Sequence, residues 1–253
     1  MTFKALHNQH RPLIIGNVWD VPSSKIAQKS GLQAIGTSSA AIAAMLGYKD
    51  GEEMNFAELK CIVRRIAQCT TLPLSVDLES GYSRDPKEIA KHIMSLAELG
   101  IVGINIEDSV VAENRVSLDP VVFAKTLNEV NKILTSQNID IFINVRIDTF
   151  ILNHSNLIEE TKRRMKLYQD AGADGFFIPS IESISHIKEI VEFTKLPVNV
   201  MCMPNLPDFD TLTRLGVKRI SMGNFLFDNM YVQFGVTTKE LLSKKSFKSV
   251  FLG

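Results

Sequence analysis

The sequence predicts a (β/α)8 TIM barrel that forms a single domain over residues 1–253. Short apolar stretches alternate with segments of helical periodicity eight times along the chain, which favours a barrel over an open sheet. The length suits one large α/β barrel as well as two small domains, but no linker or low-complexity tract divides the chain. Charged residues also stand where several expected strands end, and barrel enzymes place catalysis at the carboxyl ends of their strands.

The expected elements can be placed in chain order. The strands are 13–17, 33–37, 74–82, 102–108, 140–148, 174–179, 197–201 and 219–223. Two helices have a strong start signal, Asp85-Pro86 and Asp119-Pro120, which combine an N-cap residue with a first-turn proline. The expected helices are 22–31, 55–70, 85–100, 119–136, 156–171, 184–194, 209–215 and a last one that ends near Leu242.

Composition excludes several function classes. The chain has 28 Lys and Arg against 28 Asp and Glu, so no general attraction to nucleic acid or to an anionic membrane is expected. No apolar run approaches the ~20 residues that cross a bilayer, and residues 1–12 lack the apolar core of a secretory signal. The three cysteines have no metal-site or redox spacing, so we expect a cytoplasmic protein with free thiols.

Three successive strands, 74–82, 102–108 and 140–148, show the same alternation of apolar and polar residues. One face of each is apolar, as expected where helices cover a parallel sheet. The opposite face ends in charge: Asp77 and Glu79 on the first strand, Glu107 on the second and Arg146 on the third. Carboxylates are seldom buried without a partner, so this pattern predicts an active site at the carboxyl ends of adjacent strands.

The converging carboxylates predict a metal site. All-oxygen ligands without His or Cys favour a hard ion, Mg²⁺ before Mn²⁺ or Ca²⁺. The alternative is an ion-pair network with Arg146 and no metal, but one arginine cannot neutralise three acids. Such a metal could chelate a 2-oxo acid, with Arg146 stabilising charge on an enolate. Residues 37–40, where a strand meets a helix, offer backbone N–H groups to an anion, although small-residue packing alone also explains them.

The chain resembles the phosphoenolpyruvate mutase/isocitrate lyase superfamily over nearly its whole length. The resemblance rests on residues 35–39, 46–50, 75–82, 105–108, 145–148, 174–179 and 197–201 in combination. It implies a (β/α)8 barrel, Mg²⁺ (with Mn²⁺ as a second choice), and making or breaking C–C or P–C bonds in 2-oxo acids through a metal-bound enolate. It also implies a homo-oligomer, because members of this family exchange helices between subunits.

The resemblance implies roles for individual residues. Asp77 is the expected nearest metal ligand, and Glu79, Glu107 and Asp50 are expected around the ion, largely through water. Arg146 is expected to bind the substrate, with Arg146, Asp50 and Glu107 forming the catalytic set. The backbone at Ser38, Ser39 and Ala40 is expected to hold the substrate carboxylate, and Ser180 is a further candidate for substrate binding.

Two departures from the family narrow the reaction. The lyases carry a Lys-Lys-Cys-Gly-His or Lys-Arg-Cys-Gly-His element in a mobile loop, whereas the corresponding residues 109–117 contain no Cys, His or Lys. Ser180 stands where those lyases carry a Glu. Cleavage of isocitrate or methylisocitrate is therefore not expected.

The mutases use a Lys and an Asn in the same loop. Glu113 and Arg115 stand at those positions here, which does not favour phosphoryl transfer. We expect Asn114 and Arg115 to be solvent-exposed rather than to contact substrate. Substrate specificity is expected in residues 109–117 and at Ser180, Asn199 and Asn205.

Three functions remain open at this point. The first is a Mg²⁺-dependent 2-oxo-acid enzyme acting on an oxaloacetate-like or phosphonopyruvate-like compound. The second is a non-catalytic barrel that binds a small dicarboxylate with Mg²⁺, and the absence of a recognisable acid or base in residues 109–117 favours it. The third is a phosphate-binding biosynthetic barrel, which leaves Asp77, Glu79 and Glu107 unexplained and ranks last.

Overall fold

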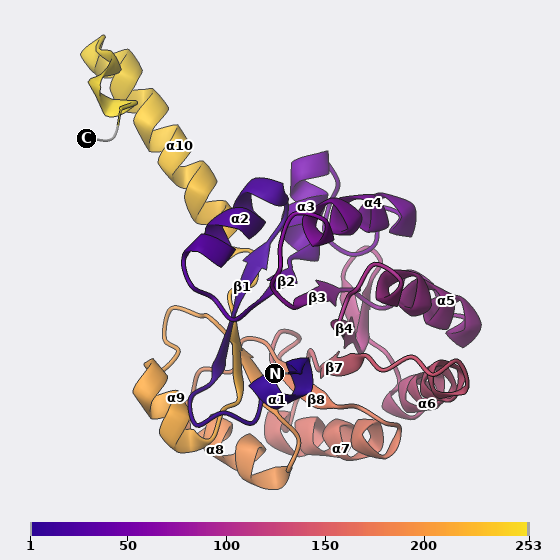
Figure 1. Cartoon of the computed structure of the whole chain (residues 1–253). Helices are drawn as coiled ribbons and strands as arrows, with labels where there is room; N and C mark the ends of the chain where they lie inside the picture. Colours follow the sequence, from indigo (N-terminus) through magenta and orange to yellow (C-terminus); the bar gives the residue numbers. More distant parts are fainter. Residues whose placement is uncertain (1, 252–253) are drawn as a thin grey trace.

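In the computed structural model, which describes residues 2–251, eight parallel strands close into a barrel (Figure 1). The strands are β1 (Leu13–Val18), β2 (Ala34–Thr37), β3 (Leu74–Asp77), β4 (Gly103–Glu107), β7 (Phe142–Arg146), β8 (Gly175–Ile178), β9 (Val198–Met201) and β10 (Arg219–Ser221). They neighbour one another in chain order, and β10 closes the barrel by pairing with β1. The predicted fold class is confirmed, and each expected strand is present, although the third ends at Asp77 instead of continuing to residue 82.

Helices surround the barrel. They are α2 (Val21–Lys29), α3 (Ser39–Leu46), α4 (Phe56–Ala67), α5 (Pro86–Ala97), α6 (Pro120–Ser136), α7 (Leu157–Asp170), α8 (Ile184–Phe193), α9 (Phe209–Leu215) and α10 (Phe225–Lys244). Both Asp-Pro helix starts are confirmed, because the Asp85 and Asp119 carboxylates accept hydrogen bonds from backbone N–H groups in the first turns of α5 and α6.

The predicted alternation of β3, β4 and β7 is also confirmed. Val76, Ile104 and Val145 are fully buried in the apolar layer beneath the helices. The other face of these strands lines the barrel interior, where Asn144 donates a hydrogen bond from Nδ2 to Oδ1 of Asn105 over 2.9 Å. TIM barrels ordinarily fill this space with branched apolar residues, so a polar interior indicates a specialised one.

The position of Glu79 corrects one expectation. β3 ends at Asp77, and Glu79 lies in a turn with φ of 49°, followed by Gly81 and Tyr82, which also have positive φ. Asp77 and Glu79 therefore do not share a strand face, and the period-two argument that placed them side by side was wrong. The turn closes through a hydrogen bond from the N–H of Gly81 to the carbonyl of Leu78.

The amino-terminal end of the barrel is closed by α1 (Phe3–Leu6), a short helix that the sequence did not predict. Phe3 packs edge-on against Phe142, the first residue of β7, and His7 stacks on the same ring with centroids 4.3 Å apart. A side chain at Gly103 would place its Cβ 2.7 Å from the ring of Phe3. Apolar packing therefore seals this end.

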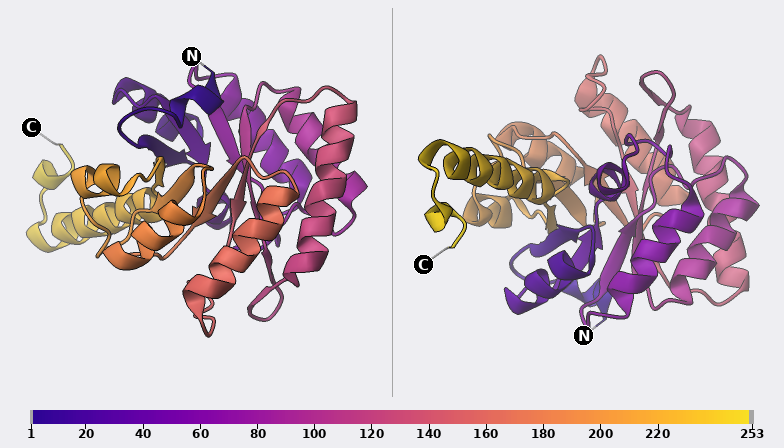
Figure 2. Two further views of the ribbon diagram at one scale, coloured as in Figure 1. Left: turned by 90° about the horizontal axis from the view of Figure 1, so that it is seen from below. Right: turned by 90° about the horizontal axis from the view of Figure 1, so that it is seen from above.

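The last helix, α10, extends away from the barrel (Figures 1 and 2). Its first turn meets the barrel, where Phe227 packs edge-on against Trp19 with ring centroids 5.2 Å apart. Most apolar side chains of α10 beyond this turn are exposed, Phe234 to 69%. Within residues 2–251 no helix has both the length and the apolar character needed to cross a membrane.

Candidate active site

A cavity of about 230 Å³ opens at the carboxyl ends of the strands. Six residues singled out from the sequence line it: Ser38, Ser39, Ala40, Asp50, Asp77 and Arg146. Ser180, Asn199 and Asn205 are not among the described residues of the lining. A larger hollow of about 620 Å³ lies at the opposite end of the barrel, near α1, away from the converging carboxylates.

Asp77 is held by the start of α3. Its Oδ2 accepts hydrogen bonds from the Ser39 hydroxyl over 2.8 Å and from the Ser39 N–H over 3.3 Å. Burial raises the pKa of Asp77, although Arg146 and Ser39 oppose the rise. The Ser38 N–H donates to the carbonyl of Val18. In this conformation the amides of Ser38 and Ser39 thus bond within the protein, rather than being free to hold a substrate carboxylate.

Arg146 lines the cavity and is held in place by Asp148. Arg146 contacts Asp148 through Nε over 2.6 Å and through Nη2 over 3.1 Å, a bidentate pair. Its Nη1 lies 2.8 Å from Oε2 of Glu107. Burial alone would raise the pKa of Asp148, but Arg146 and the Ser109 hydroxyl hold it below its ordinary value. Asp148 is therefore an ionised anchor for the guanidinium group of Arg146.

Residues 109–117 form an antiparallel hairpin of β5 (Ser109–Val111) and β6 (Arg115–Ser117) that the sequence did not predict. The hairpin turns Arg115 inward, where its Nη1 pairs with Glu107 and lies 3.1 Å from Asp148. Its Nη2 lies 3.0 Å from Oδ2 of Asp50, and only 15% of its side chain is exposed. Asn114 is exposed as expected, but the expectation of an exposed Arg115 was wrong.

The loop that carries Asp50 is fixed from two directions. Gly51 has φ of 106°, and a Cβ there would lie 2.3 Å from Cβ of Val111, so the loop and the hairpin meet too closely for a larger residue. Glu52 accepts hydrogen bonds from the Ser80 hydroxyl and the Tyr82 N–H, which ties the loop to the turn that holds Glu79. These contacts bring Asp50 to the cavity edge.

Carboxyl groups outnumber the guanidinium groups that pair with them at this site. Two guanidinium groups, of Arg115 and Arg146, face five carboxylates, which belong to Asp50, Asp77, Glu79, Glu107 and Asp148. Burial, followed by repulsion from Asp50 and Asp77, raises the pKa of Glu79 to about 9. Burial also raises the pKa of Glu107 to about 7, despite its contacts with both arginines. Mutual repulsion of this kind is relieved by a cation.

The acids nevertheless do not form a ready-made metal site. Among residues 2–251, no group of three or more His, Cys, Asp or Glu side chains is arranged to hold an ion. Glu107 is engaged by two arginines and Asp77 by Ser39, whereas Oε2 of buried Glu79 has no hydrogen-bond partner in the described structure. The all-oxygen donors fit a hard divalent cation near Asp77, Glu79 and Asp50.

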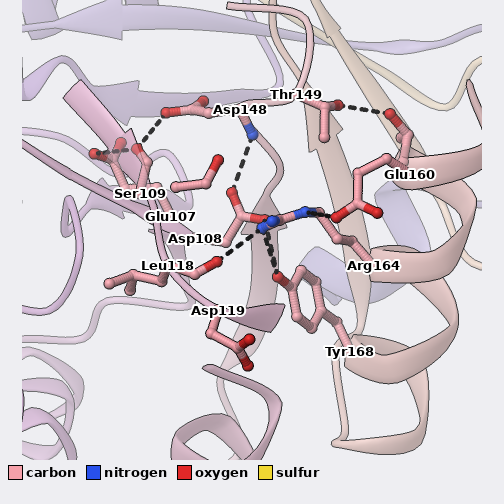
Figure 3. A network of polar contacts seen from close by, with 12 residues as sticks. Glu107, Asp108, Ser109, Leu118, Asp119, Asp148, Thr149, Glu160, Arg164 and Tyr168 are labelled. Atoms are coloured by element: carbon pink, nitrogen blue, oxygen red, sulfur yellow. Dashed lines mark hydrogen bonds and ion pairs between the residues drawn. The ribbon is translucent and has the colours of Figure 1, made fainter. Parts of the chain in front are cut away.

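A buried network outside the cavity supports the hairpin and Asp148 (Figure 3). Asp108, which follows β4, accepts hydrogen bonds from Arg164 over 2.6 Å and from the Tyr168 hydroxyl over 2.8 Å. Its other oxygen accepts the backbone N–H of Asp148. The carbonyl of Asp108 accepts the Leu118 N–H, and the carbonyl of Leu118 accepts from Arg164, so both ends of the hairpin are fixed to this network.

Sequence reasoning missed Arg115, Asp148 as an anchor, and the Asp108 network. Asp148 was visible as the continuation of the polar face that carries Arg146, two residues earlier. Arg115 had no comparable signal, because its strand is short and lies outside the barrel.

The fold and site define a (β/α)8 barrel with an acidic, arginine-containing pocket at the carboxyl ends of its strands. The chain belongs to the phosphoenolpyruvate phosphomutase family, whose sequence pattern matches residues 3–242. It is thus a member of the phosphoenolpyruvate mutase/isocitrate lyase superfamily of enzymes, as the sequence resemblance indicated.

Related proteins cover most of the chain. An uncharacterised protein of Mycobacterium tuberculosis (strain H37Rv) is 34% identical over 226 residues, which span 88% of this chain and 82% of that protein. Oxaloacetate decarboxylase of Ectopseudomonas mendocina is 25% identical over 230 residues, 88% of this chain and 77% of the enzyme. The crystal structure of a proposed phosphonomutase from Burkholderia cenocepacia J2315 superposes with a TM-score of 0.88 at 34% identity, covering 94% of this chain and 97% of that one.

The buried network gives a test of stability. Arg164→Met should lower the free energy of unfolding by about 3–5 kcal/mol, because it leaves the fully buried Asp108 without its cationic partner. The neighbouring Arg163→Met is the matched control, since Arg163 is half-exposed and pairs with Glu160 on the same helix, and it should change stability by less than about 1 kcal/mol. Urea unfolding followed by circular dichroism measures both. Equal midpoints for the two variants would contradict the assignment.

Proposed function

We propose that this protein is a Mg²⁺-dependent enzyme that cleaves a C–C bond in a small 2-oxo dicarboxylate of the oxaloacetate type, releasing CO₂. The observation that carries the proposal is that one small cavity is lined by two guanidinium groups, Arg115 and Arg146, and by the carboxyl groups of Asp50 and Asp77. Glu79 and Glu107 lie next to these groups without lining the cavity. The arginines suit the charges of a dianionic substrate, and the uncompensated carboxylates suit a divalent cation.

The missing acid–base residues favour decarboxylation over the other reactions of the superfamily. Residues 109–117 supply Arg115 to the cavity but contain no Cys, His or Lys. Loss of CO₂ from a 2-oxo dicarboxylate needs an electron sink rather than a base. The bond to the departing carboxylate breaks, its electron pair passes into the 2-oxo group as an enolate, and a proton from water then adds to carbon. The similarity to oxaloacetate decarboxylases supports this choice.

Different residues of the cavity bind the metal, stabilise the developing charge and hold the substrate carboxylate. A bound Mg²⁺ would supply Lewis-acid polarisation of the 2-oxo group, and Asp77, Glu79 and Asp50 would hold it, in part through water. Arg146 stabilises the negative charge that develops on the substrate oxygen, because Asp148 fixes its guanidinium group at the cavity wall. Glu107 and Asp50 orient the two arginines. Because the N–H groups of Ser38 and Ser39 are bonded within the protein, the N–H of Ala40, in the first turn of α3, is the amide that we assign to the substrate carboxylate.

The metal role of Asp77 is directly testable. Asp77→Asn should lower turnover of oxaloacetate at saturating Mg²⁺ by about 100-fold or more, because an amide is a poor ligand for a hard cation. Pyruvate release in a coupled assay reports turnover, and thermal shift with Mg²⁺ and oxalate reports binding. Asp170→Asn, at an exposed helix position, is the matched control. Unchanged turnover and metal binding in Asp77→Asn would refute the metal assignment.

The same assay separates catalysis from simple binding. If oxalate with Mg²⁺ stabilises the wild-type protein but oxaloacetate, phosphonopyruvate and 2-methylisocitrate are all left intact, the protein is the non-catalytic binding barrel. Phosphate released from phosphonopyruvate, without decarboxylation of oxaloacetate, would instead identify P–C chemistry.

Arg115 should govern the preference for a second carboxylate. Arg115→Met is expected to raise the KM for oxaloacetate about 10- to 100-fold, through loss of charge-assisted hydrogen bonds, while inhibition by the monocarboxylate pyruvate changes little. Arg65→Met, at an exposed position of α4, controls for loss of a positive charge. Equal loss of oxaloacetate and pyruvate binding would show that Arg115 acts on the site as a whole rather than on the second carboxylate.

We also propose that the protein is a homo-oligomer in which α10 packs against a second copy. An apolar groove of about 450 Å³ lies between α2 and the start of α10, and Val18, Trp19, Ile26 and Met230 contribute to its lining. Exposed apolar residues continue along α10, among them Tyr231 and Phe234. A protein seldom leaves such a continuous apolar surface uncovered, and a second copy supplies both a groove and a helix of matching character.

Assembly can be tested without disturbing the barrel. Phe234→Asp should convert the oligomer to the 28.2 kDa monomer in light scattering after size exclusion, because it places a charge in the proposed interface. Val122→Asp, the same kind of change at an exposed apolar position of α6, is the control and should leave the oligomer intact. A monomeric wild-type protein would contradict the proposal.

A further inference from the structure

Asn105 lies in the barrel interior directly at the cavity floor. It is 5% exposed, stands opposite Asp77 in the register of β3 and β4, and lines the cavity. Its side-chain carbonyl Oδ1 accepts hydrogen bonds from Nδ2 of Asn144 over 2.9 Å and from Nη2 of Arg219 over 3.4 Å. Asn105 is not among the site residues predicted from the sequence, and it has no part in the proposed mechanism.

These two donors fix the orientation of the amide. An asparagine side chain has an acceptor end and a donor end, and here the acceptor end is occupied from within the barrel. The inverted orientation would set its NH₂ group against two other donors, which is unfavourable in a buried place. The NH₂ group of Asn105 is therefore the end that is available to a molecule in the cavity.

Arg219 is an unusual residue for a barrel interior. It is 1% exposed, and no carboxylate of residues 2–251 lies within ion-pair distance of it. Its Nε and Nη1 have no hydrogen-bond partner in the described structure. A guanidinium group does not lose its proton at ordinary pH, so a buried and unpaired one is costly and suggests a role in function.

The groups around Arg219 indicate that its role concerns the cavity. His7, on the side away from the cavity, is buried, and burial followed by the nearby Arg219 lowers its pKa to about 4, so it is neutral at pH 7. Asn199, its neighbour in the register of β9 and β10, is neutral as well. Burial lowers the pKa of Arg219 to about 10, and the negative charge of Asp77, at the cavity, opposes this fall.

We propose that Asn105 is a ligand-binding residue whose NH₂ group donates to an anionic oxygen of the substrate, and that Arg219 is the positioning residue that fixes this amide from below. The class of ligand, a small 2-oxo acid or dicarboxylate, rests on the proposed function.

Calorimetric titration with oxalate, in the presence of Mg²⁺, tests both residues. Asn105→Ala should weaken oxalate binding about tenfold, the value of one hydrogen bond to a charged group. Asn105→Asp should weaken it further, because one carboxylate oxygen takes the two internal donors and the other faces the bound anion. Asn138→Asp, the same chemical change at an exposed position after α6, should leave the affinity unchanged.

Arg219 is tested through its dependence on Asn105. Arg219→Met should weaken oxalate binding, Arg219→Lys should retain most of the affinity, and Arg219→Met should have little further effect when Asn105 is already Ala. Non-additivity of this kind distinguishes a residue that acts through Asn105 from one that only supports the barrel. Thermal unfolding of each variant shows whether it is folded. If Arg219→Met does not fold, Arg219→Lys is measured in its place.

The outcomes separate the two proposals. Wild-type protein that binds oxalate, together with Asn105→Ala and Asn105→Asp variants that bind it equally well, would overturn the role of Asn105 and leave the proposed function standing. Additive losses from the changes at Asn105 and Arg219 would overturn the positioning role of Arg219. Wild-type protein that binds neither oxalate nor pyruvate, with or without Mg²⁺, would overturn the proposed function and this inference together.

Discussion

Two buried carboxylates, Glu107 and Asp148, are each shared by the same two arginines, and the form of the active site depends on this sharing. Arg146 comes from the end of a barrel strand and Arg115 from a hairpin outside the barrel. Because each acid contacts both arginines, the hairpin is held over the cavity by the same groups that fix the barrel arginine. Removing one partner would leave a buried charge unpaired, which is costly, so the four side chains form one unit.

This unit needs support from outside the cavity, and the Asp108 network supplies it. The carboxylate of Asp108 accepts hydrogen bonds from Arg164 and Tyr168 of α7 and from the backbone N–H of Asp148. Its backbone carbonyl accepts the N–H of Leu118, at the end of the hairpin. A helix on the outside of the barrel therefore determines where the inward-facing groups stand. Positioning of this kind is what allows charged groups to act on a substrate without reorganising.

The sequence predicted those features that follow from the regular alternation of side chains along a strand. The alternation in β3, β4 and β7 identified the barrel and placed Asp77 and Arg146 at the carboxyl ends of the strands. It failed for Glu79, because a turn with positive φ interrupts the period after Asp77. It failed for Arg115, because the direction of this side chain is decided by contacts with Glu107, before the hairpin, and with Asp148 and Asp50, which lie far away in the sequence.

The polar interior of the barrel is the feature least explained by stability. Barrels of this type ordinarily stack branched apolar side chains in layers, whereas this one buries Asn105, Asn144, Asn199 and Arg219. Each polar group that lacks a full set of partners costs free energy, and for Arg219 no charge within contact distance in the described structure repays it. Such a cost is most readily understood if the groups act together on a ligand. The orientation of Asn105 supports that view, since two donors occupy its carbonyl oxygen and leave its NH₂ group available to a ligand.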